Sequence, residues 1–287
     1  MSTTLDHVGI AAHDLDRLAA TYAGLGFTLT PLARHAGPLA PGGPVVPFGT
    51  GNRCAMLGVP GRPQGYLELI ARIDPNAPAN SLDRFLRRYE GIHIVAFGVA
   101  DADAELARLR ERGFDLPGIA YLERPADPED PAKGTARFAR LPLPNDASPE
   151  GRMQLIQHLT PERIWRDEWI SHPNRAVRLA GLVIAVADVA EAAGRFRRLT
   201  GVAPATGPDL ATFDLAGAPM RLVAAAGLGQ WFPGVAAPTL PFIAGVLIDT
   251  ADGARAIRGI AAGRGRAVEG GFLLPPEAAG GTALLFR

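Results

Sequence analysis

The chain has 287 residues, of which 47% are hydrophobic and 20% charged, an ordinary composition for a globular protein that buries a full core. Its 29 basic and 29 acidic residues cancel to zero formal charge, which argues against a nucleic-acid-binding or membrane-surface protein. The N-terminus lacks a basic segment followed by an apolar run, and Gly, Pro or Arg interrupts the longest apolar stretches. We therefore expect a cytoplasmic protein of one large domain or two of ordinary size.

Composition also excludes several kinds of catalytic site. Cys54 is the only cysteine, so the chain has neither a disulfide framework nor a thiolate zinc site. Lys133, the only lysine, lies in a stretch expected to be a solvated loop, which leaves no good candidate for Schiff-base catalysis. No serine lies in a Gly-x-Ser-x-Gly motif, and no glycine-rich nucleotide-binding motif follows a predicted strand. Histidines, carboxylates and arginines remain, and these suit an oxygen-and-nitrogen metal site or acid–base chemistry.

The chain opens with a strand, a helix and three further extended segments. Residues 5–12 are expected to form the strand, and Asp14 then caps a helix whose apolar residues recur at spacings of three and four until Gly26 ends it. Strand character is expected next at residues 27–30, 53–57 and 66–71, with a Gly/Pro-rich loop over residues 35–51.

The same pattern returns three more times along the chain. In the second unit, Asp101 precedes Gly113 by twelve residues, the distance that separates Asp14 from Gly26. A third unit has Asp188 as its helix cap, and a fourth runs from residue 241 to the end. One β-α-β-β-β unit has too little apolar face to be stable alone, so we expect an α+β fold in which units pair into curved mixed sheets with helices outside.

Pairing of consecutive units divides the chain into two tandem halves. Residues 1–159 form the first half, residues 176–287 form a second, more degenerate half, and a linker helix is expected over residues 160–175. In this linker Trp165 and Trp169 are one helical turn apart, and we expect them to pack between the halves.

Three stretches carry a resemblance to a known family: Leu5-Asp6-His7-Val8-Gly9-Ile10, Gly49-Thr50-Gly51-Asn52-Arg53 and Tyr66-Leu67-Glu68-Leu69-Ile70. They resemble the vicinal oxygen chelate superfamily of glyoxalase I, bleomycin-resistance proteins and extradiol dioxygenases, and more narrowly the glyoxalase-like domain family. The resemblance covers about residues 1–175. It implies a cup formed by paired units that holds a divalent metal ion (Zn, Mn, Fe or Ni), which chelates two adjacent oxygens of a small-molecule substrate and stabilises an enediolate-type oxyanion.

The resemblance also implies which residues form the site. Metal ligands come from the first and fourth strands of each unit, which places His7 and Glu68 in the first unit and, by alignment of residues 152–156 with residues 66–70, Gln154 in the second. Glu68 is the expected catalytic residue, as a proton shuttle. Asn52 and Arg53 follow a glycine turn and, with His35, are expected to bind the substrate. The implied activity is that of a metal-assisted lyase or isomerase.

The fourth ligand position lacks a histidine in the correct phase. His7 precedes its helix cap by seven residues, whereas His93 precedes Asp101 by eight and Ile94 precedes it by seven. Strand side chains alternate between faces, so without a bulge we expect Ile94 at the ligand position and His93 on the opposite face. A ring-cleaving dioxygenase, which uses two histidines and a carboxylate, is therefore disfavoured.

Other interpretations of the same residues stay open. Glu68 lies in an otherwise apolar strand, where a carboxylate is costly to bury unless a metal, a cation or hydrogen bonds hold it; a structural ion pair with Arg53 is the alternative. The second functional hypothesis is a metal-free protein that binds or sequesters a small molecule in the same cavity. A third is a structural or interaction protein, in which changes at His7 and Glu68 affect stability alone. We expect a small-molecule partner and neither nucleic acid nor membrane, and the sequence is compatible with a homodimer.

Overall fold

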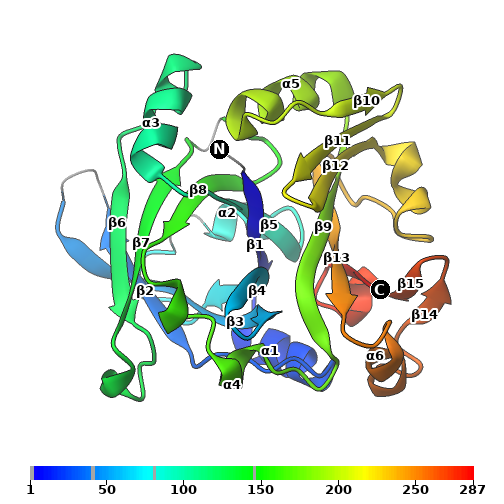
Figure 1. Ribbon diagram of the computed structural model, residues 1–287, viewed down its shortest axis with the longest axis horizontal. Coiled ribbons are helices and arrows are strands. Elements are labelled where there is room, and N and C mark those ends of the chain that lie inside the picture. The colour runs from blue at the N-terminus through cyan, green and yellow to red at the C-terminus, as the bar shows by residue number, and fades with distance from the viewer. Residues whose placement is uncertain (1–2, 40–42, 80–81, 145–146) are drawn as a thin grey trace.

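The structure is a computed structural model that describes residues 3–39, 43–79, 82–144 and 147–287. Its elements form the four β-α-β-β-β units expected from the sequence (Figure 1). The first unit has β1 (Thr4–Ala12), α1 (Leu15–Gly24), β2 (Ala33–Pro38), β3 (Val45–Val59) and β4 (Arg62–Arg72), and a short helix α2 (Leu82–Leu86) follows it. The second has β5 (Gly91–Gly98), α3 (Ala102–Glu111), β6 (Ala120–Pro125), β7 (Thr135–Pro142) and β8 (Arg152–His158), with the 3-10 turn η1 (Pro131–Lys133) between β6 and β7.

The second half repeats this order. Its third unit has β9 (Ala176–Val186), α5 (Val189–Thr200), β10 (Ala205–Gly207), β11 (Leu210–Leu215) and β12 (Ala218–Ala224), followed by the 3-10 segment η3 (Ala225–Gln230). The fourth has β13 (Phe242–Thr250), α6 (Arg255–Ile260), β14 (Arg266–Val268), β15 (Gly271–Leu274) and β16 (Ala283–Phe286), with η4 (Pro276–Ala278) before the last strand. Between the halves lie η2 (Pro161–Arg163) and the four-residue helix α4 (Asp167–Ile170) rather than one continuous helix.

The helix caps predicted from the sequence are confirmed. Asp14, Asp101 and Asp188 each have extended backbone angles, and each side chain accepts a hydrogen bond from the backbone N–H three residues later. This bond satisfies one of the N–H groups that the first turn of a helix leaves without a partner, which is why the aspartate marks the start of each helix.

Two extended segments differ from expectation. The Gly/Pro-rich stretch expected as a loop contains β2 and the start of β3, which pair as an antiparallel hairpin, while residues 27–30 form no strand. β6, which the sequence did not indicate, pairs with β7 over six residues. Both are edge strands of the sheet: among the described strands, β2 pairs only with β3, and β6 only with β7. Proline and glycine are tolerated in an edge strand because one of its sides needs no hydrogen bonds to a neighbouring strand.

Each half is a curved sheet built around its two first strands. In the first half β1 pairs antiparallel with β5, and each of these pairs parallel with the fourth strand of its own unit, β1 with β4 and β5 with β8. In the second half β9 and β13 repeat the central antiparallel pair, flanked by β12 and β16. The two sheets meet where Ile243 of β13 pairs with Ile92 of β5.

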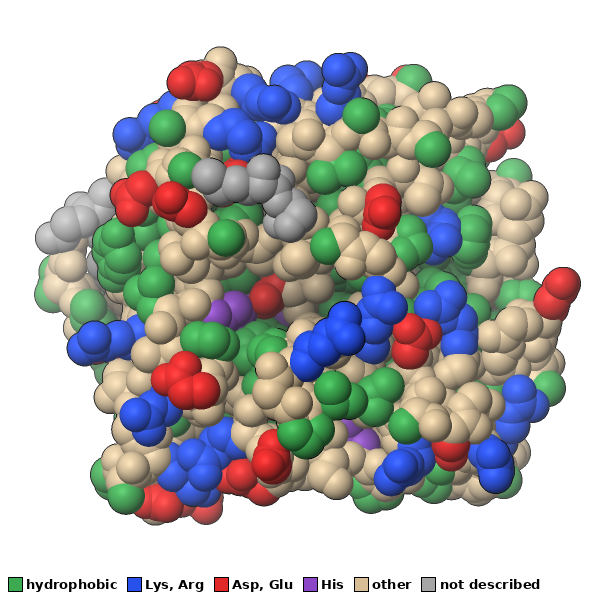
Figure 2. Space-filling model, viewed as in Figure 1, with side chains coloured by type: hydrophobic (Ala, Val, Ile, Leu, Met, Phe, Trp, Pro, Cys, Tyr) green, Lys and Arg blue, Asp and Glu red, His purple; other side chains and the backbone are tan. Residues whose placement is uncertain are grey.

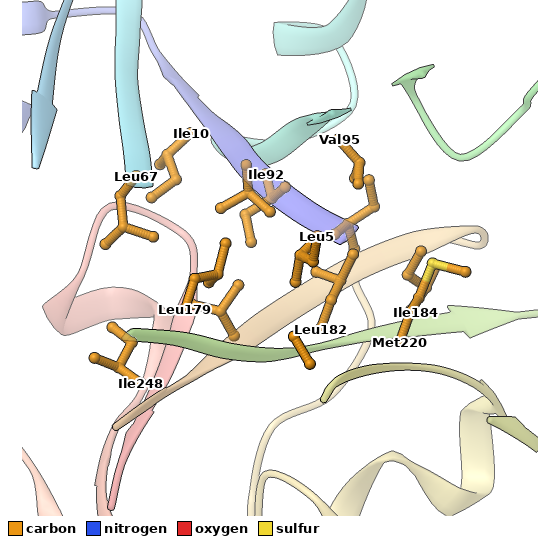
Figure 3. Close-up of a cluster of buried hydrophobic side chains, with 14 of the residues drawn as sticks. Leu5, Ile10, Leu67, Ile92, Val95, Leu179, Leu182, Ile184, Met220 and Ile248 are labelled. Atoms are coloured by element: carbon orange, nitrogen blue, oxygen red, sulfur yellow. The ribbon is translucent and has the colours of Figure 1, made fainter. Parts of the chain in front are cut away.

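The halves pack against each other through one face of each sheet. Leu5, Ile10 and Leu67 of the first half lie opposite Leu179 and Leu182 of the second in a shared hydrophobic core (Figure 3). Residues of opposite phase, such as Met56 and Tyr66 in the first half, belong to separate clusters on the other face of each sheet. The concave side of each half is therefore turned away from the shared core.

The two linker tryptophans do not occupy the position expected from the sequence. Trp169 is buried in the cluster on the concave side of the first half, and the indole N–H of Trp165 donates to the Leu57 carbonyl oxygen at 3.0 Å. They close one end of the first cup instead of packing between halves, because α4 packs against β3 and η2 against β7. The longest helix, α5, has 12 residues, and none of the helices in the described part of the chain has the length and hydrophobicity that a membrane crossing requires.

Candidate active site in the first cup

The strand register brings the predicted metal ligands together on the concave face of the first half. One row of paired residues across the sheet contains Tyr66, His7, Ala96 and Gln154, and the next row on the same face contains Cys54, Glu68, Gly9, Ile94 and Arg152. Exchange of the first and second units, which swaps β1 with β5 and β4 with β8, places one row on the other with the order of its residues reversed. Under this exchange His7 corresponds to Ile94 and Glu68 corresponds to Gln154, so the four predicted ligand positions lie in two adjacent rows.

His7 is oriented by its neighbour Asp6. The Nδ1 of His7 lies 2.6 Å from Oδ1 of Asp6, and the same carboxylate lies 3.0 Å from Nε2 of His158. Since Asp6 accepts the Nδ1 proton, the lone pair of the His7 imidazole is on Nε2, which faces the amide of Gln154 at 3.4 Å. A histidine held through its second nitrogen in this way is the usual arrangement of a metal ligand and also of a general base.

Asp6 reaches His7 because β1 has a bulge at this residue. Leu5 pairs with Phe97 and His7 pairs with Ala96, so Asp6 is an extra residue without a partner in β5. A bulge changes the direction of the side chain it carries. Burial alone would raise the pKa of the Asp6 carboxyl, but His158 and His7 together hold it well below its ordinary value. Asp6 is therefore an anion that fixes two imidazole rings.

Glu68 is a buried carboxylate held by an amide and two histidines. Its side chain is on the cup face of β4 and is 9% exposed. Asn52 Nδ2 donates to Glu68 Oε1 at 2.5 Å, and Nε2 of His35 lies 3.9 Å from the same oxygen. Burial acts to raise the pKa of Glu68, but His7, His35 and the Asn52 hydrogen bond outweigh it, and the pKa lies below its ordinary value. Glu68 is consequently ionised at neutral pH.

The predicted substrate-binding residues are divided between the two faces of β3. Asn52 contacts Glu68, and His35, which lies on β2, also hydrogen-bonds Thr50 Oγ1 at 2.9 Å, so both belong to the cup. Arg53 pairs with Leu69, a residue of the shared core, and its Nη1 donates to the Thr30 carbonyl oxygen at 3.2 Å. The structure thus brings Asn52 and His35 to Glu68 and does not bring Arg53 there, which also removes the suggested Glu68–Arg53 ion pair.

Ile94 lies at the position equivalent to His7, which is the predicted fourth ligand position, as the phase of the sequence indicates. Gly9 pairs with Ile94 and Ile10 pairs with Ile92, so the strand has a bulge at His93, yet Ile94 stays on the face of Glu68. A Cβ on Gly9 would lie 2.8 Å from Ile94 Cβ and 3.1 Å from Glu68 Oε2, so the glycine provides the space in which these side chains meet. The ring of His93 stacks with Phe85 and Tyr89 instead of facing the site.

The donor atoms of the cup fit a divalent metal ion that takes nitrogen and oxygen ligands. His7 Nε2 and the Glu68 carboxylate lie on neighbouring strands, and Gln154 Oε1 and Asn52 Oδ1 are buried without hydrogen-bond partners in the described part of the chain. No group of three His, Cys, Asp or Glu residues in that part is placed to hold a metal. A metal ion bound here needs the amide oxygen of Gln154 as its third ligand. A set of nitrogen and oxygen ligands completed by water suits Mn or Zn.

Other residues close the cup or line its second wall. Tyr66 stacks on His7 with ring centroids 4.3 Å apart, and Trp165 packs edge-on against Tyr66. Burial raises the pKa of the Cys54 thiol to about 12, so this residue, opposite Glu68, is neither a thiolate ligand nor a nucleophile. Figure 2 shows histidine and acidic side chains recessed below the surrounding surface over this half.

In the second half, which the structure describes throughout, the four positions equivalent to the predicted ligands carry no metal donor. By register, Gly181 occupies the position of His7, Arg221 that of Glu68, Gly245 that of Ile94 and Leu285 that of Gln154. The Arg221 guanidinium stacks over the Trp231 ring, 4.1 Å from its centroid, and Phe232 is fully buried in the same cluster. The second cup is filled by the chain's own side chains.

A surface groove of about 470 Å³ lies between α1 and the segment Pro276–Gly281, away from either cup. Within this lining, Arg17 donates two hydrogen bonds of 2.8 Å to the Glu90 carboxylate. Arg17 and Glu90 thus pair with each other, Glu277 is the other charged residue among the described lining residues, and none of these residues is a histidine. We therefore take the first cup, and not this groove, as the candidate site.

The comparison with protein families decides the identity of the fold. A family model described as a glyoxalase-like domain matches residues 5–200, more than half of the chain. The chain belongs to the glyoxalase-like domain family. The match confirms the resemblance expected from the sequence, and it spans β1, β4 and β8, the strands that carry His7, Glu68 and Gln154. No curated protein matches the sequence.

Solved structures share the fold over most of this glyoxalase-like chain. A hypothetical protein from Staphylococcus aureus has a TM-score of 0.64 at 13% identity, covering 99% of each chain. The Mn(II)-bound glyoxalase from Novosphingobium aromaticivorans has a TM-score of 0.55 at 14% identity, covering 99% of this chain and 81% of the other. A mutant 4-hydroxymandelate synthase from Streptomyces coelicolor has a TM-score of 0.53 at 14% identity, covering 91% and 75%. At such identities the likeness concerns the fold.

Sequence reasoning missed several residues of this site. Asp6 and His158 form the carboxylate–imidazole group behind His7, and Arg140 and Arg152 lie on the cup face of β7 and β8. Asp6 stands in the recognised Leu-Asp-His stretch, but side-chain alternation assigns it to the other face. The only indication of the two arginines in the sequence is that they are charged residues at strand positions that face inward.

Proposed function

We propose that this protein is a small-molecule enzyme, a lyase or isomerase, whose site is the first cup. The observation that supports this most is the convergence of His7, Glu68 and Gln154 in two adjacent rows, with Asp6 holding the rear nitrogen of His7. A structural role for these groups would require each buried polar atom to find a partner, and the amide oxygens of Gln154 and Asn52 have none among the described residues.

The proposed metal is bound by His7, Glu68 and Gln154. When bound, it supplies Lewis-acid stabilisation of the negative charge that develops on a substrate oxygen, as in an enediolate-type oxyanion. The glyoxalase from Novosphingobium aromaticivorans, which shares this fold and is Mn(II)-bound, supports a divalent ion as the cofactor of the proposed site. The requirement for an amide ligand predicts an affinity lower than that of a site with three His or carboxylate ligands.

The chain's own residues account for proton transfer and orientation. Glu68 is ionised and therefore able to accept a proton from a carbon next to a carbonyl group and to return it to the neighbouring carbon. Asn52 fixes one carboxylate oxygen of Glu68, and its free amide oxygen faces the cup. Tyr66, Trp165 and Ile94 keep the site apolar around these groups, which strengthens their electrostatic effect.

The test of the metal has a direct readout. Purified protein loaded with Mn(II) or Zn(II) and then desalted is expected to retain close to one equivalent by elemental analysis, and His7→Ala and Glu68→Gln are each expected to lose it. Glu123→Gln is the matched control, because Glu123 is exposed on the outer face of β6. Retention of the metal by both site variants would contradict the proposed ligand set.

The test of the reaction uses hydrogen exchange at carbon. Metal-loaded protein in D₂O is expected to exchange the hydrogen next to the carbonyl group in one or more members of a panel of 2-hydroxy and 2-oxo compounds, followed by proton NMR. Glu68→Gln is expected to slow this exchange at least 100-fold, since general-base catalysis contributes on the order of 10²–10⁴ in rate.

A metal-free binding or sequestering protein is the second candidate. Ile94 at the predicted fourth ligand position and the arginines Arg140 and Arg152 on the cup face of β7 and β8 favour it, because an apolar residue replaces a donor and guanidinium groups repel a bound cation. Protein that takes up no metal yet binds small molecules in the cup would support this candidate over the enzyme.

A further inference from the structure

The Asp6 carboxylate, which holds His7, is itself held by the imidazole of His158 on β8. Nε2 of His158 lies 3.0 Å from Oδ2 of Asp6 and 3.1 Å from Oδ1, so one ring nitrogen spans both carboxylate oxygens. Nδ1 of His7 lies 2.6 Å from Oδ1. Asp6 is the bulge residue of β1 and pairs with no residue of β5. The orientation of its carboxylate therefore depends on side-chain contacts, and His158 restrains the carboxylate plane.

The position of His158 leaves one of its ring nitrogens unsatisfied. Because the Asp6 anion only accepts hydrogen bonds, Nε2 of His158 carries the proton of their contact. Nδ1 of His158 is buried and has no hydrogen-bond partner among the described residues, which lowers stability. His172 shows the contrasting case, since the Thr28 N–H donates to its Nδ1 and its Nε2 bonds to the Met56 carbonyl oxygen. His158 is thus placed for its contact with Asp6 and not for the best hydrogen bonding of its own ring.

Aromatic side chains hold the ring of His158. Trp165, Phe138 and Tyr66 contact it edge-on, with ring centroids 4.8, 5.4 and 6.4 Å from its own. Edge-on contacts of this kind are favourable between aromatic rings. Trp165 is fixed in turn, because its indole N–H donates to the Leu57 carbonyl oxygen. The linker between the halves therefore reaches His158 through Trp165.

Trp165 also contacts the second group that holds His7. Tyr66 stacks on the His7 ring with centroids 4.3 Å apart, and Trp165 packs against Tyr66 at 5.8 Å. Tyr66 thus restrains the face of the His7 ring, and Asp6 restrains its Nδ1. Trp165 and His158 lie behind both restraints.

The third unit keeps the bulge of β1 but not its carboxylate. Gly181 occupies the position of His7, and Ala180 is the extra residue of β9 as Asp6 is of β1. The bulge therefore forms without a carboxylate, and Asp6 is not needed for the strand pairing. Within this chain the carboxylate is present in the unit that has the histidine.

We infer that His158 is a positioning residue of the proposed site, which fixes His7 through Asp6, and that Trp165 of the linker keeps His158 in place. Without His158 the Asp6 carboxylate is free to turn, the Nδ1–H of His7 loses its acceptor, and the His7 proton also occupies Nε2. The inference rests on the proposed function only where it concerns the metal. The orientation of His7 is a property of the metal-free protein and is measured there.

The first test observes the His7 tautomer in metal-free protein at pH 7.5. Long-range proton–nitrogen NMR spectra of isotope-labelled histidine distinguish the two neutral tautomers, and the signals lost in His7→Gln assign His7. Wild type is expected to have its His7 proton on Nδ1. His158→Phe keeps a ring but has no donor, and it is expected to show both tautomers; His158→Gln keeps a donor and is expected to restore part of the wild-type signal. An unchanged His7 tautomer in His158→Phe overturns the inference.

A matched control separates positioning from a general loss of stability. His172→Phe removes a buried histidine that is bonded through both nitrogens, so it is expected to lower the melting temperature at least as much as His158→Phe and to leave the His7 tautomer unchanged. Equal changes of the His7 signals in both variants overturn the inference.

Trp165 provides a second route to the same readout. Trp165→Ala is expected to shift the His7 tautomer in the same direction as His158→Phe, and Trp165→Phe, which keeps an aromatic ring, is expected to stay closer to wild type. This pair carries the test if His158→Phe does not fold. A wild-type His7 signal in Trp165→Ala overturns the part of the inference that concerns the linker.

Metal affinity separates this inference from the proposed function. His158→Phe is expected to weaken Mn(II) or Zn(II) binding about tenfold, the lower end of the effect of groups behind a ligating histidine. If wild type binds no metal and His158→Phe still shifts the His7 tautomer, the proposed metal enzyme alone is contradicted. If wild type binds metal and His158→Phe leaves both the tautomer and the affinity unchanged, this inference alone is contradicted.

Discussion

At the scale of single residues, the site depends on Asp6, which is not itself a proposed ligand. Its carboxylate fixes the proton of His7 on Nδ1 and holds the rings of His7 and His158 in place. Groups that hold a ligating histidine from behind are known to contribute strongly to metal affinity, because they set the tautomer and the ring orientation.

Asp6→Asn is therefore expected to weaken Mn(II) or Zn(II) binding by about 10- to 100-fold without changing the ligands themselves. Competition with a fluorescent chelator measures this directly. Asp16→Asn, at an exposed position of α1, serves as the control. Equal affinities of Asp6→Asn and wild type would show that the Asp6–His7 contact has no role in metal binding.

Glu68 leads to a prediction of pH dependence. Its pKa in the folded protein lies below the ordinary value of 4.5, so the ionised form stabilises the folded state above that pH, and this contribution is lost as the pH falls through the folded-state pKa. Urea unfolding between pH 7 and pH 3 is expected to show a steeper loss of stability on the acid side in wild type than in Glu68→Gln. Parallel curves would contradict the lowered pKa.

At the scale of elements, residue counting predicted which positions of the first two units are equivalent. The distance of seven residues from strand residue to aspartate cap placed His7 and Ile94 in equivalent positions, and the alignment of β4 with β8 placed Gln154 at the position equivalent to Glu68. The contribution of Asp6 could not be predicted, because it requires a bulge, and a bulge depends on the pairing of two strands rather than on the sequence of one. β2 and β6 were missed for a similar reason: pairing, not composition, holds them.

The equivalence of His7 and Ile94 can be tested by completing the ligand set. Ile94→His introduces an imidazole in the row of Glu68, so the site would have two histidines, a carboxylate and an amide, and the Mn(II) or Zn(II) affinity is expected to rise at least about tenfold. The variant also removes an apolar residue from the cluster with Ala11 and Ile70, and we expect a loss of about 1–3 kcal/mol in unfolding free energy.

Ile92→His provides the comparison for this gain, since Ile92 points into the shared core instead of the cup. It is expected to lose stability without gaining affinity. An Ile94→His protein that folds and binds metal no better than wild type would show that this position does not face the ligand site.

At the scale of the whole molecule, the second half serves the first as a packing partner. Its own cup has an arginine in place of the proposed acid and is filled by Trp231 and Phe232, while its opposite face completes the core behind β1 and β4. Two halves that share one buried interface of this kind are expected to unfold together, because neither sheet retains its apolar backing when the other is lost.

Leu179 connects the halves and provides the test of this coupling. Leu179 is 1% exposed. A Cβ placed on Gly65 of β4 would lie only 3.0 Å from the Cβ of Leu179, so Leu179 packs directly against the first half. Leu179→Ala is expected to cost about 2–5 kcal/mol, whereas Leu159→Ala, at an exposed position, is expected to stay within about 0.5 kcal/mol of wild type. The three tryptophans allow each half to be followed separately: Trp165 reports on the first cup and Trp231 on the second. In variants that retain one of these tryptophans, Leu179→Ala is expected to shift both fluorescence transitions equally, because the cavity lies in the core that both halves share. A shift confined to Trp231 would mean that the first half keeps its stability alone, and that the second half is not required to support the site.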